Sequence, residues 1–211
     1  MSRFDWTLYL VTDRRLAGGR PLPGLVAAAV RGGVTAVQLR EKECATREFI
    51  GLARALKALL EPLGVPLIVN DRVDIALAAG ADGVHLGQSD MDCRDARRVL
   101  GPSAVIGLSV ENLDQAAAAP PEADYLGVSP VFSTPTKTDT APEWGISGLV
   151  ALRRATRRPL VAIGGIDCGN AAQVIGGGAD GIAVVSAICA APDPELAARA
   201  LRRAIRRGYS E

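Results

Sequence analysis

Polar and charged side chains follow a short apolar run at Gln38, Arg40 and Lys42. Their spacing of i, i+2 and i+4 points all three to one face of an extended segment. Two cations and an amide on one face could bind a diphosphate together with a polar ring. Alternatively, Arg40 forms a structural ion pair with Glu41, and Lys42 is only solvated.

Two carboxylates come at the ends of the next two apolar runs. Asp71 follows Asn70 in IVND, and Asp90 lies in GQSD. Carboxylates on adjacent strand ends suit a hard cation such as Mg²⁺, which binds through one or two carboxylates, waters and substrate phosphates. In the competing interpretation both aspartates are helix N-caps, because each precedes a helical pattern.

Three later segments could bind phosphate. The hydroxyl-rich stretch 133–139 (STPTKTD) includes Lys137 and offers donors and a cation for a leaving anion, although such loops are commonly just solvated. AIGGI (162–166) and VVSAI (184–188) end apolar runs, and glycine lets backbone N–H groups approach an anion closely. These two predict a monophosphate site, and tight packing at a glycine turn is the alternative.

His85 is the only histidine of the chain. When the repeats described below are aligned, it occupies the strand position of Gln38. We expect an inward-facing core histidine with its hydrogen bonds satisfied. Contact with a bound heterocycle comes second, and a general base third.

The elements that would position these residues alternate along the chain. Eight short apolar runs bounded by Gly or Pro read as buried parallel strands, and Ala/Arg/Leu-rich stretches such as 47–64 between them show helical spacing. The runs are 8–13, 36–41, 66–71, 83–88, 104–110, 125–132, 159–166 and 181–188. The alternation predicts a parallel sheet covered by helices.

A recurrence favours closure of that sheet into a barrel. A small-residue turn leads into every second strand, in GGVTAVQL (32–39), AGADGVHL (79–86), EADYLGV (122–128) and GGADGIAV (177–184). A fourfold-like barrel would produce this pattern, and a doubly wound sheet would not require it. We therefore predict an α/β fold, a (β/α)₈ TIM barrel, as one domain over 1–211. Its active site should lie at the carboxyl ends of the strands, where the polar residues above are found.

The composition of the chain narrows the classes of partner that it could bind. Net charge is +1, from 24 basic and 23 acidic residues, and aromatic residues make up 4%. These values predict no nucleic-acid or membrane partner. Four cysteines without CxxC spacing indicate reduced, mostly packed thiols. No apolar stretch has the length of a signal peptide or membrane span, so we expect a cytoplasmic protein.

The motifs in this order resemble one family, the thiamine-phosphate synthases, over nearly the whole chain. The most specific segments are QLREK (38–42), IVNDRVDIALAAGADGVHLGQSD (68–90), GLSV (107–110), TPTK (134–137), AIGGI (162–166) and VVSAI (184–188). The resemblance implies condensation of hydroxymethylpyrimidine diphosphate with thiazole phosphate, giving thiamine phosphate and diphosphate. It also implies that diphosphate leaves first.

The resemblance further implies roles for named residues. The pyrimidine diphosphate is expected to contact Gln38, Leu39, Arg40, Glu41, Lys42, Asn70, Ser109 and Lys137. Of these, the expected catalytic residues are Arg40, Lys42, Ser109 and Lys137. The thiazole phosphate is expected to contact Thr134, Pro135, Thr136, Gly165, Val185 and Ser186. One Mg²⁺ per subunit is expected on Asp71 and Asp90. The expected partners are thus phosphorylated small molecules.

Two positions depart from the family pattern. Ser129 stands where glycine usually precedes the proline, and Ser133 where proline or threonine is common. Two other functions remain open for a barrel of this composition. One is a thiazole tautomerase, which needs only the monophosphate site and a proton-transferring residue. The other is a barrel that binds phosphate ligands without catalysis. A purely structural partner would give no reason for cations and carboxylates to collect at one barrel mouth.

Overall fold

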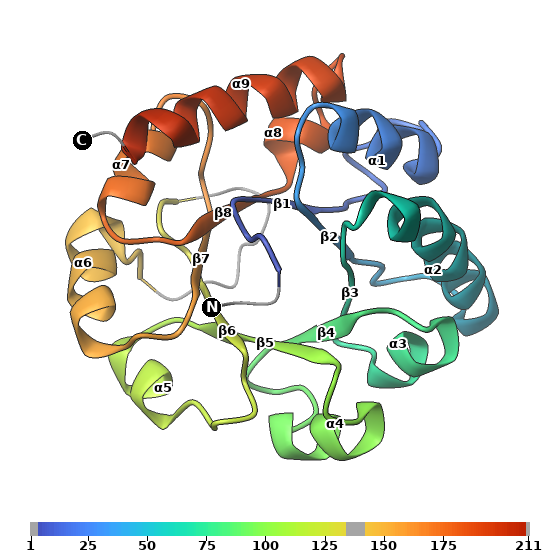
Figure 1. Ribbon diagram of the computed structural model, residues 1–211, viewed down its shortest axis with the longest axis horizontal. Helices are drawn as coiled ribbons and strands as arrows, with labels where there is room; N and C mark the ends of the chain where they lie inside the picture. Colours follow the sequence, from blue (N-terminus) through green and yellow to red (C-terminus); the bar gives the residue numbers. More distant parts are fainter. Residues whose placement is uncertain (1–3, 134–141, 210–211) are drawn as a thin grey trace.

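A computed structural model of the protein describes residues 4–133 and 142–209. Eight parallel strands close into a barrel in the order β1 to β8, with helices around the outside (Figure 1). The strands are β1 (Leu8–Val11), β2 (Ala36–Leu39), β3 (Leu67–Asn70), β4 (Gly83–Leu86), β5 (Val105–Val110), β6 (Tyr125–Val128), β7 (Leu160–Ile163) and β8 (Gly181–Val184). The predicted TIM barrel is confirmed, and the doubly wound alternative is wrong.

Helices alternate with the strands and form the outer layer. They are α1 (Leu22–Arg31), α2 (Thr46–Leu60), the 3₁₀ turn η1 (Glu61–Leu63), α3 (Val73–Ala79), α4 (Cys93–Leu100), α5 (Leu113–Ala118), α6 (Gly145–Ala155), α7 (Ala171–Gly176), α8 (Ser186–Cys189) and α9 (Pro194–Gly208). The helix α9 packs against α7 and α1 and so joins the two ends of the chain (Figure 1). Asp193 caps α9, because its carboxylate accepts a hydrogen bond from Leu196 N–H at 3.0 Å.

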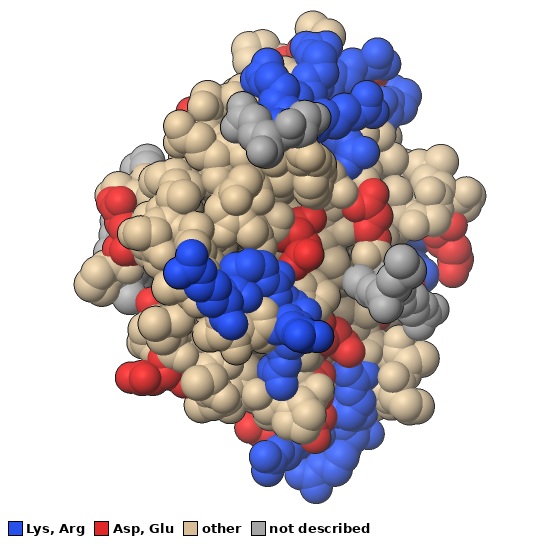
Figure 2. Space-filling view, turned by 60° about the vertical axis from the view of Figure 1, so that its left-hand side comes forward, with Lys and Arg blue, Asp and Glu red and all other residues tan. Residues whose placement is uncertain are grey.

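The surface carries both signs of charge. On the face shown in Figure 2, lysines and arginines form several separate groups with acidic side chains among them. The distribution agrees with the small net charge of +1. Within residues 4–133 and 142–209, every helix is too short or too polar to cross a bilayer.

Side-chain alternation along the strands divides the apolar residues into two cores. Leu8 and Leu10 of β1 point outward into the cluster between sheet and helices, whereas Tyr9 and Val11 point into the barrel. Inside, Trp6 lies against Tyr125 with ring centroids 4.5 Å apart. Aromatic rings therefore fill the lower part of the barrel, below the polar residues at its carboxyl end.

The recurring turn before every second strand has a structural explanation. Asp82, Asp124 and Asp180 precede β4, β6 and β8, and each carboxylate accepts a hydrogen bond from a backbone N–H at the start of the preceding strand. The distances to the N–H groups of Leu67, Ile106 and Leu160 are 2.9, 2.7 and 2.7 Å. Thr35, before β2, does the same with its hydroxyl, which accepts from Leu8 N–H at 3.0 Å.

A basic side chain from the helix that precedes each strand pair completes the acidic turn. Lys57, Arg97 and Arg153 reach Asp82, Asp124 and Asp180 at 3.0, 2.7 and 2.9 Å. The recurrence thus joins each strand pair to the helix that precedes its first strand, and it lies at the end of the barrel opposite the polar mouth. It contributes to stability rather than to a site.

We predict that Asp82→Ala lowers the free energy of unfolding by about 2 kcal/mol, because Leu67 N–H loses its partner and Lys57 keeps only Glu61. Urea denaturation would measure the change. Asp74→Ala is the matched control, since Asp74 is exposed and paired only with nearby Arg72 in a surface salt bridge. Equal effects of the two substitutions would contradict the role assigned to Asp82.

Candidate active site

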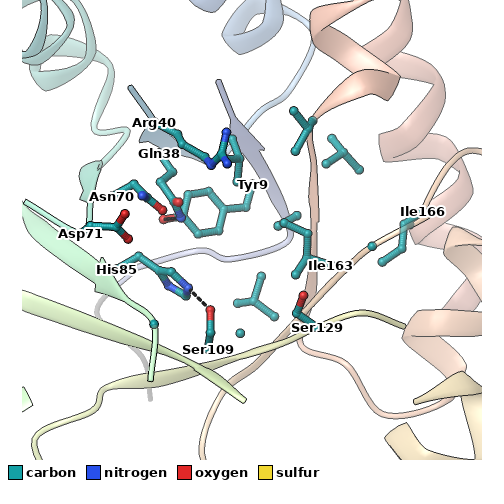
Figure 3. Close-up of a pocket in the computed structure, with 18 of the residues that line it drawn as sticks. Tyr9, Gln38, Arg40, Asn70, Asp71, His85, Ser109, Ser129, Ile163 and Ile166 are labelled. Carbon is teal, nitrogen blue, oxygen red and sulfur yellow. Dashed lines mark hydrogen bonds between the residues drawn. The ribbon is translucent and has the colours of Figure 1, made fainter. Parts of the chain in front are cut away.

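A cavity of about 850 Å³ opens at the carboxyl end of the barrel. All eight strands contribute side chains or backbone to its wall. Figure 3 shows Gln38, Asn70, His85 and Ser109 pointing toward one side of it, and Ile163 and Ile166 lying opposite. For the described residues, the predicted placement of the polar side chains at the strand ends is confirmed.

Gln38, Arg40 and Lys42 lie on one wall of the cavity, as their spacing predicts. Gln38 is 4% exposed, and Arg40 and Lys42 follow toward the rim. The backbone N–H of Arg40 donates to Thr12 Oγ1 at 3.1 Å, and the Arg40 guanidinium lies 3.7 Å from the Asp13 carboxylate. The alternative in which Arg40 pairs with Glu41 is therefore wrong.

Leu39 and Glu41 do not line the cavity, in contrast to the expectation that they contact the pyrimidine substrate. Strand alternation turns both to the opposite face from Gln38 and Arg40. Leu39 is fully buried in the outer core. The Glu41 carboxylate accepts hydrogen bonds from Arg14 Nε at 3.2 and 3.1 Å. The side chains of the two residues thus support the wall from behind, and their contact with the substrate stays a prediction.

Asp71 and Asp90 both line the cavity, close to each other and to Lys42. Asp71 is held in the left-handed backbone region at φ 61°, which is rare for a residue with a side chain, and Lys42 Nζ lies 2.5 Å from its carboxylate. Asp90 accepts from Gly87 N–H at 2.7 Å. Burial raises the pKa of Asp90, and the neighbouring Asp71 carboxylate adds to the rise.

The N-cap interpretation of these aspartates is wrong. Arg72 stands at the N-cap position of α3, and Asp92 caps α4 by accepting from Arg94 N–H at 2.8 Å. Two nearby carboxylates with mutual repulsion fit a cation that takes most of its ligands from water and substrate. Across the described part of the chain, no cluster of three or more His, Cys, Asp or Glu residues could hold a metal by itself.

His85 lies half-buried at the cavity floor, with both ring nitrogens in hydrogen bonds. Nδ1 is 2.8 Å from the Tyr125 hydroxyl, and Nε2 is 2.9 Å from Ser109 Oγ. Burial lowers the pKa of His85 to about 4, so its imidazole is neutral at neutral pH. The prediction of an inward-facing, satisfied histidine is confirmed.

Sequence reasoning missed Tyr9 and Tyr125, which also line the cavity. Burial raises the pKa of both phenols, and the two hydroxyls lie 3.1 Å apart. The signal was present in the strand pattern, since an alternating buried strand that places a tyrosine inward must give its hydroxyl a partner. Only closure of the barrel brings β1 and β6 within reach of each other.

The opposite wall contains glycine and small residues beside Ile163 and Ile166. Gly164 and Gly165 have φ angles of 106° and 62°, and a side chain at Gly165 would come within 2.8 Å of Phe132 Cβ. Val185 and Ser186 lie beside them at the start of α8. Ser129, one of the departures from the family pattern, also lines the cavity. Thr134, Pro135, Thr136 and Lys137 lie outside the described residues.

The fold and cavity define an enzyme of the (β/α)₈-barrel class with its active site at the carboxyl ends of the strands. Comparison with known proteins narrows the class. The family model described as thiamine monophosphate synthase matches residues 8–188, and the chain belongs to this family.

Relatives support the assignment over nearly the whole chain. A thiamine-phosphate synthase of Albidiferax ferrireducens is 63% identical over 199 residues, which cover 94% of this chain and 91% of the relative. One of Xanthobacter autotrophicus is 58% identical and covers 96% of each chain. The solved structure of a thiamine phosphate pyrophosphorylase from Pyrococcus furiosus superposes with a TM-score of 0.88, at 40% identity and 97% coverage of each chain.

Gly107 supplies a test of the floor geometry. It lies on β5 between His85 and Tyr125, and a methyl group there would overlap the Tyr125 ring and His85 Nδ1. We predict that Gly107→Ala lowers the free energy of unfolding by about 2 kcal/mol, as overpacking does. Gly51→Ala, at an open helical position, should leave stability equal or higher. Urea denaturation of both variants would measure these changes in the free energy of unfolding. A Gly107→Ala variant as stable as the wild type would contradict the packing described.

Proposed function

We propose that this protein is a thiamine-phosphate synthase. In the proposed reaction, 4-amino-2-methyl-5-hydroxymethylpyrimidine diphosphate and 4-methyl-5-(2-phosphoethyl)thiazole give thiamine phosphate and diphosphate. One observation carries the proposal: a single cavity joins amide side chains, two cations and the Asp71–Asp90 carboxylate pair to a glycine-lined wall opposite. Such a cavity suits one diphosphate and one monophosphate substrate. The close relatives with this activity support the same reading.

In this proposal Gln38 and Asn70 hold the pyrimidine, and Arg40, Lys42 and Ser109 bind the diphosphate. The cations stand at the rim and the amides deeper, so the diphosphate would extend from Ser109 toward Arg40 and Lys42. Lys137 is assigned to the diphosphate from its sequence motif alone. Gly165, Val185 and Ser186 are assigned to the thiazole phosphate, together with Thr134, Pro135 and Thr136 on sequence grounds.

Asp71 and Asp90 would hold one Mg²⁺, for which their proximity is suitable. When bound, the ion would neutralise charge on the diphosphate. Lys42 already lies 2.5 Å from Asp71, so the same carboxylate links the proposed ion site to the basic wall. Such an arrangement lets cation and carboxylate charges balance around an anionic substrate.

The chemistry asked of the protein is positioning and charge neutralisation. Diphosphate would depart toward Arg40, Lys42 and Lys137, and the pyrimidine-methyl cation would be captured by the thiazole nitrogen held across the cavity. We further propose that 1–211 acts as one catalytic domain. The cytoplasm is its proposed location, in keeping with free thiols at Cys93 and Cys189.

Arg40→Ala should lower kcat/KM for the pyrimidine diphosphate at least tenfold, since a charge-assisted contact to the leaving group is lost. Lys137→Ala should lower kcat similarly. Release of diphosphate is measured with both substrates and Mg²⁺. Arg15→Ala serves as control, because Arg15 lies on the neighbouring loop, exposed and paired with Glu43. Intact protein that releases no diphosphate would refute the synthase proposal and favour a tautomerase or a binding protein.

Asp90→Asn should raise the Mg²⁺ concentration for half-maximal activity about tenfold or more, because one of two anionic ligands is lost. Asp95→Asn on α4 is the matched control, since Asp95 pairs only with Arg98 on the surface. Titration of activity against Mg²⁺, with Mn²⁺ binding followed separately by electron paramagnetic resonance, gives two readouts. Unchanged metal dependence in Asp90→Asn would remove Asp90 from the proposed site.

A further inference from the structure

An unbroken chain of hydrogen bonds crosses the floor of the cavity. Gln38 Nε2 donates to the Tyr9 hydroxyl at 3.1 Å, and that hydroxyl lies 3.1 Å from the Tyr125 hydroxyl. The chain continues from Tyr125 to His85 Nδ1 at 2.8 Å and from His85 Nε2 to Ser109 Oγ at 2.9 Å. Five strands are connected in this way: β2, β1, β6, β4 and β5.

The middle of this hydrogen-bond chain, formed by Tyr9 and Tyr125, is shielded from water. Tyr9 and Tyr125 are 1% and 0% exposed, and both rings rest on Trp6 beneath them. Gly107 and Gly127 leave the space that the His85 and Tyr125 side chains occupy. Each phenol hydroxyl therefore has only its two neighbours in the chain as partners, and each must accept from one and donate to the other.

Such a chain has a single direction once one end is set. Because Tyr9 accepts from the Gln38 amide, its own proton goes to Tyr125. Tyr125 then donates to His85 Nδ1, and the neutral imidazole carries its proton on Nε2. Ser109 Oγ accepts that proton, which leaves the Ser109 hydroxyl proton without a partner among the described residues.

The two ends of the chain both face the cavity, with opposite character. Gln38 uses its amide nitrogen on Tyr9, so its carbonyl oxygen is free to accept from a ligand. Ser109 is free to donate. A ligand that fits has a hydrogen-bond donor over Gln38 and an anionic acceptor over Ser109.

We propose that Tyr125 is a positioning residue, which couples the amide of Gln38 to the hydroxyl of Ser109 through Tyr9 and His85. It makes the floor selective for an amino-substituted ring that carries an anionic group. Its identification with the aminopyrimidine diphosphate rests on the proposed function. The coupling itself is a property of the ligand-free protein.

The tautomer of His85 reports the direction in which the hydrogen bonds of this chain run. Because His85 is the only histidine, ¹⁵N-histidine labelling of tag-free protein gives a single imidazole. We expect Nε2 protonated and Nδ1 unprotonated in the wild type at neutral pH. In Tyr125→Phe, which keeps the ring on Trp6 but removes the donor to Nδ1, a mixture of both tautomers is expected. Tyr9→Phe, which removes the donor to Tyr125, should also give a mixture and serves as the second variant.

Kinetics separate positioning from general destabilisation. Tyr125→Phe should lower kcat/KM for the pyrimidine diphosphate about tenfold, with KM for the thiazole phosphate within about twofold of wild type. The double variant Tyr9→Phe/Tyr125→Phe should lose no more than either single variant, since one chain is broken only once. Tyr209→Phe, at an exposed hydroxyl bonded to Asp180 carbonyl, is the control and should match wild type.

The outcomes distinguish the two proposals. A wild-type imidazole protonated on Nδ1, or a tautomer unchanged in both Tyr125→Phe and Tyr9→Phe, would overturn the coupling. Additive losses in the double variant would also overturn it. The expected tautomers in a protein that releases no diphosphate would support the coupling and count against the synthase function.

Discussion

Closure of eight short parallel strands into a barrel is the constraint on which the rest of this structure depends. Because side chains alternate along each strand, closure leaves only a few inward positions per strand, and these must fill the barrel and build the site together. Tyr9 and Val11 of β1 illustrate the limit, since one hydroxyl and one methyl-bearing side chain are all that β1 presents inward. The site is therefore assembled from many strands, each supplying one or two groups.

Large and small residues share the interior in a complementary way. Tyr125 and His85 are bulky, and they are accommodated because Gly107 and Gly127 on β5 and β6 give up their side-chain volume. The same exchange creates the polar layer to which they belong. Because the phenols are buried, their hydroxyls need hydrogen-bond partners. His85 provides one for Tyr125, at the level where the cavity begins.

Charged side chains of both signs meet where the barrel opens. Arg40, Lys42, Asp71 and Asp90 lie at the rim, in a protein whose net charge is only +1. Opposite charges at the mouth hold one another in place, as the contact of Lys42 with Asp71 shows. At the other end of the barrel, acidic turns such as Asp82 with Lys57 bind strands to helices. Binding groups and stabilising groups thus occupy opposite ends of the same strands, which lets the loops at the mouth vary without loss of the fold.

The sequence alone determined the order of strands and helices, their approximate bounds, the barrel and the group of residues at its mouth. It could do so because strand burial, helical spacing and the recurring turn before β2, β4, β6 and β8 are local patterns. It could not separate Leu39 and Glu41 from Gln38 and Arg40, since a motif does not say which face of a strand meets the cavity. Nor could it connect Tyr9 with Tyr125, which are 116 residues apart and meet across the barrel. Only the tertiary structure decides such contacts, because the partner of a buried hydroxyl is set by which strands closure brings together.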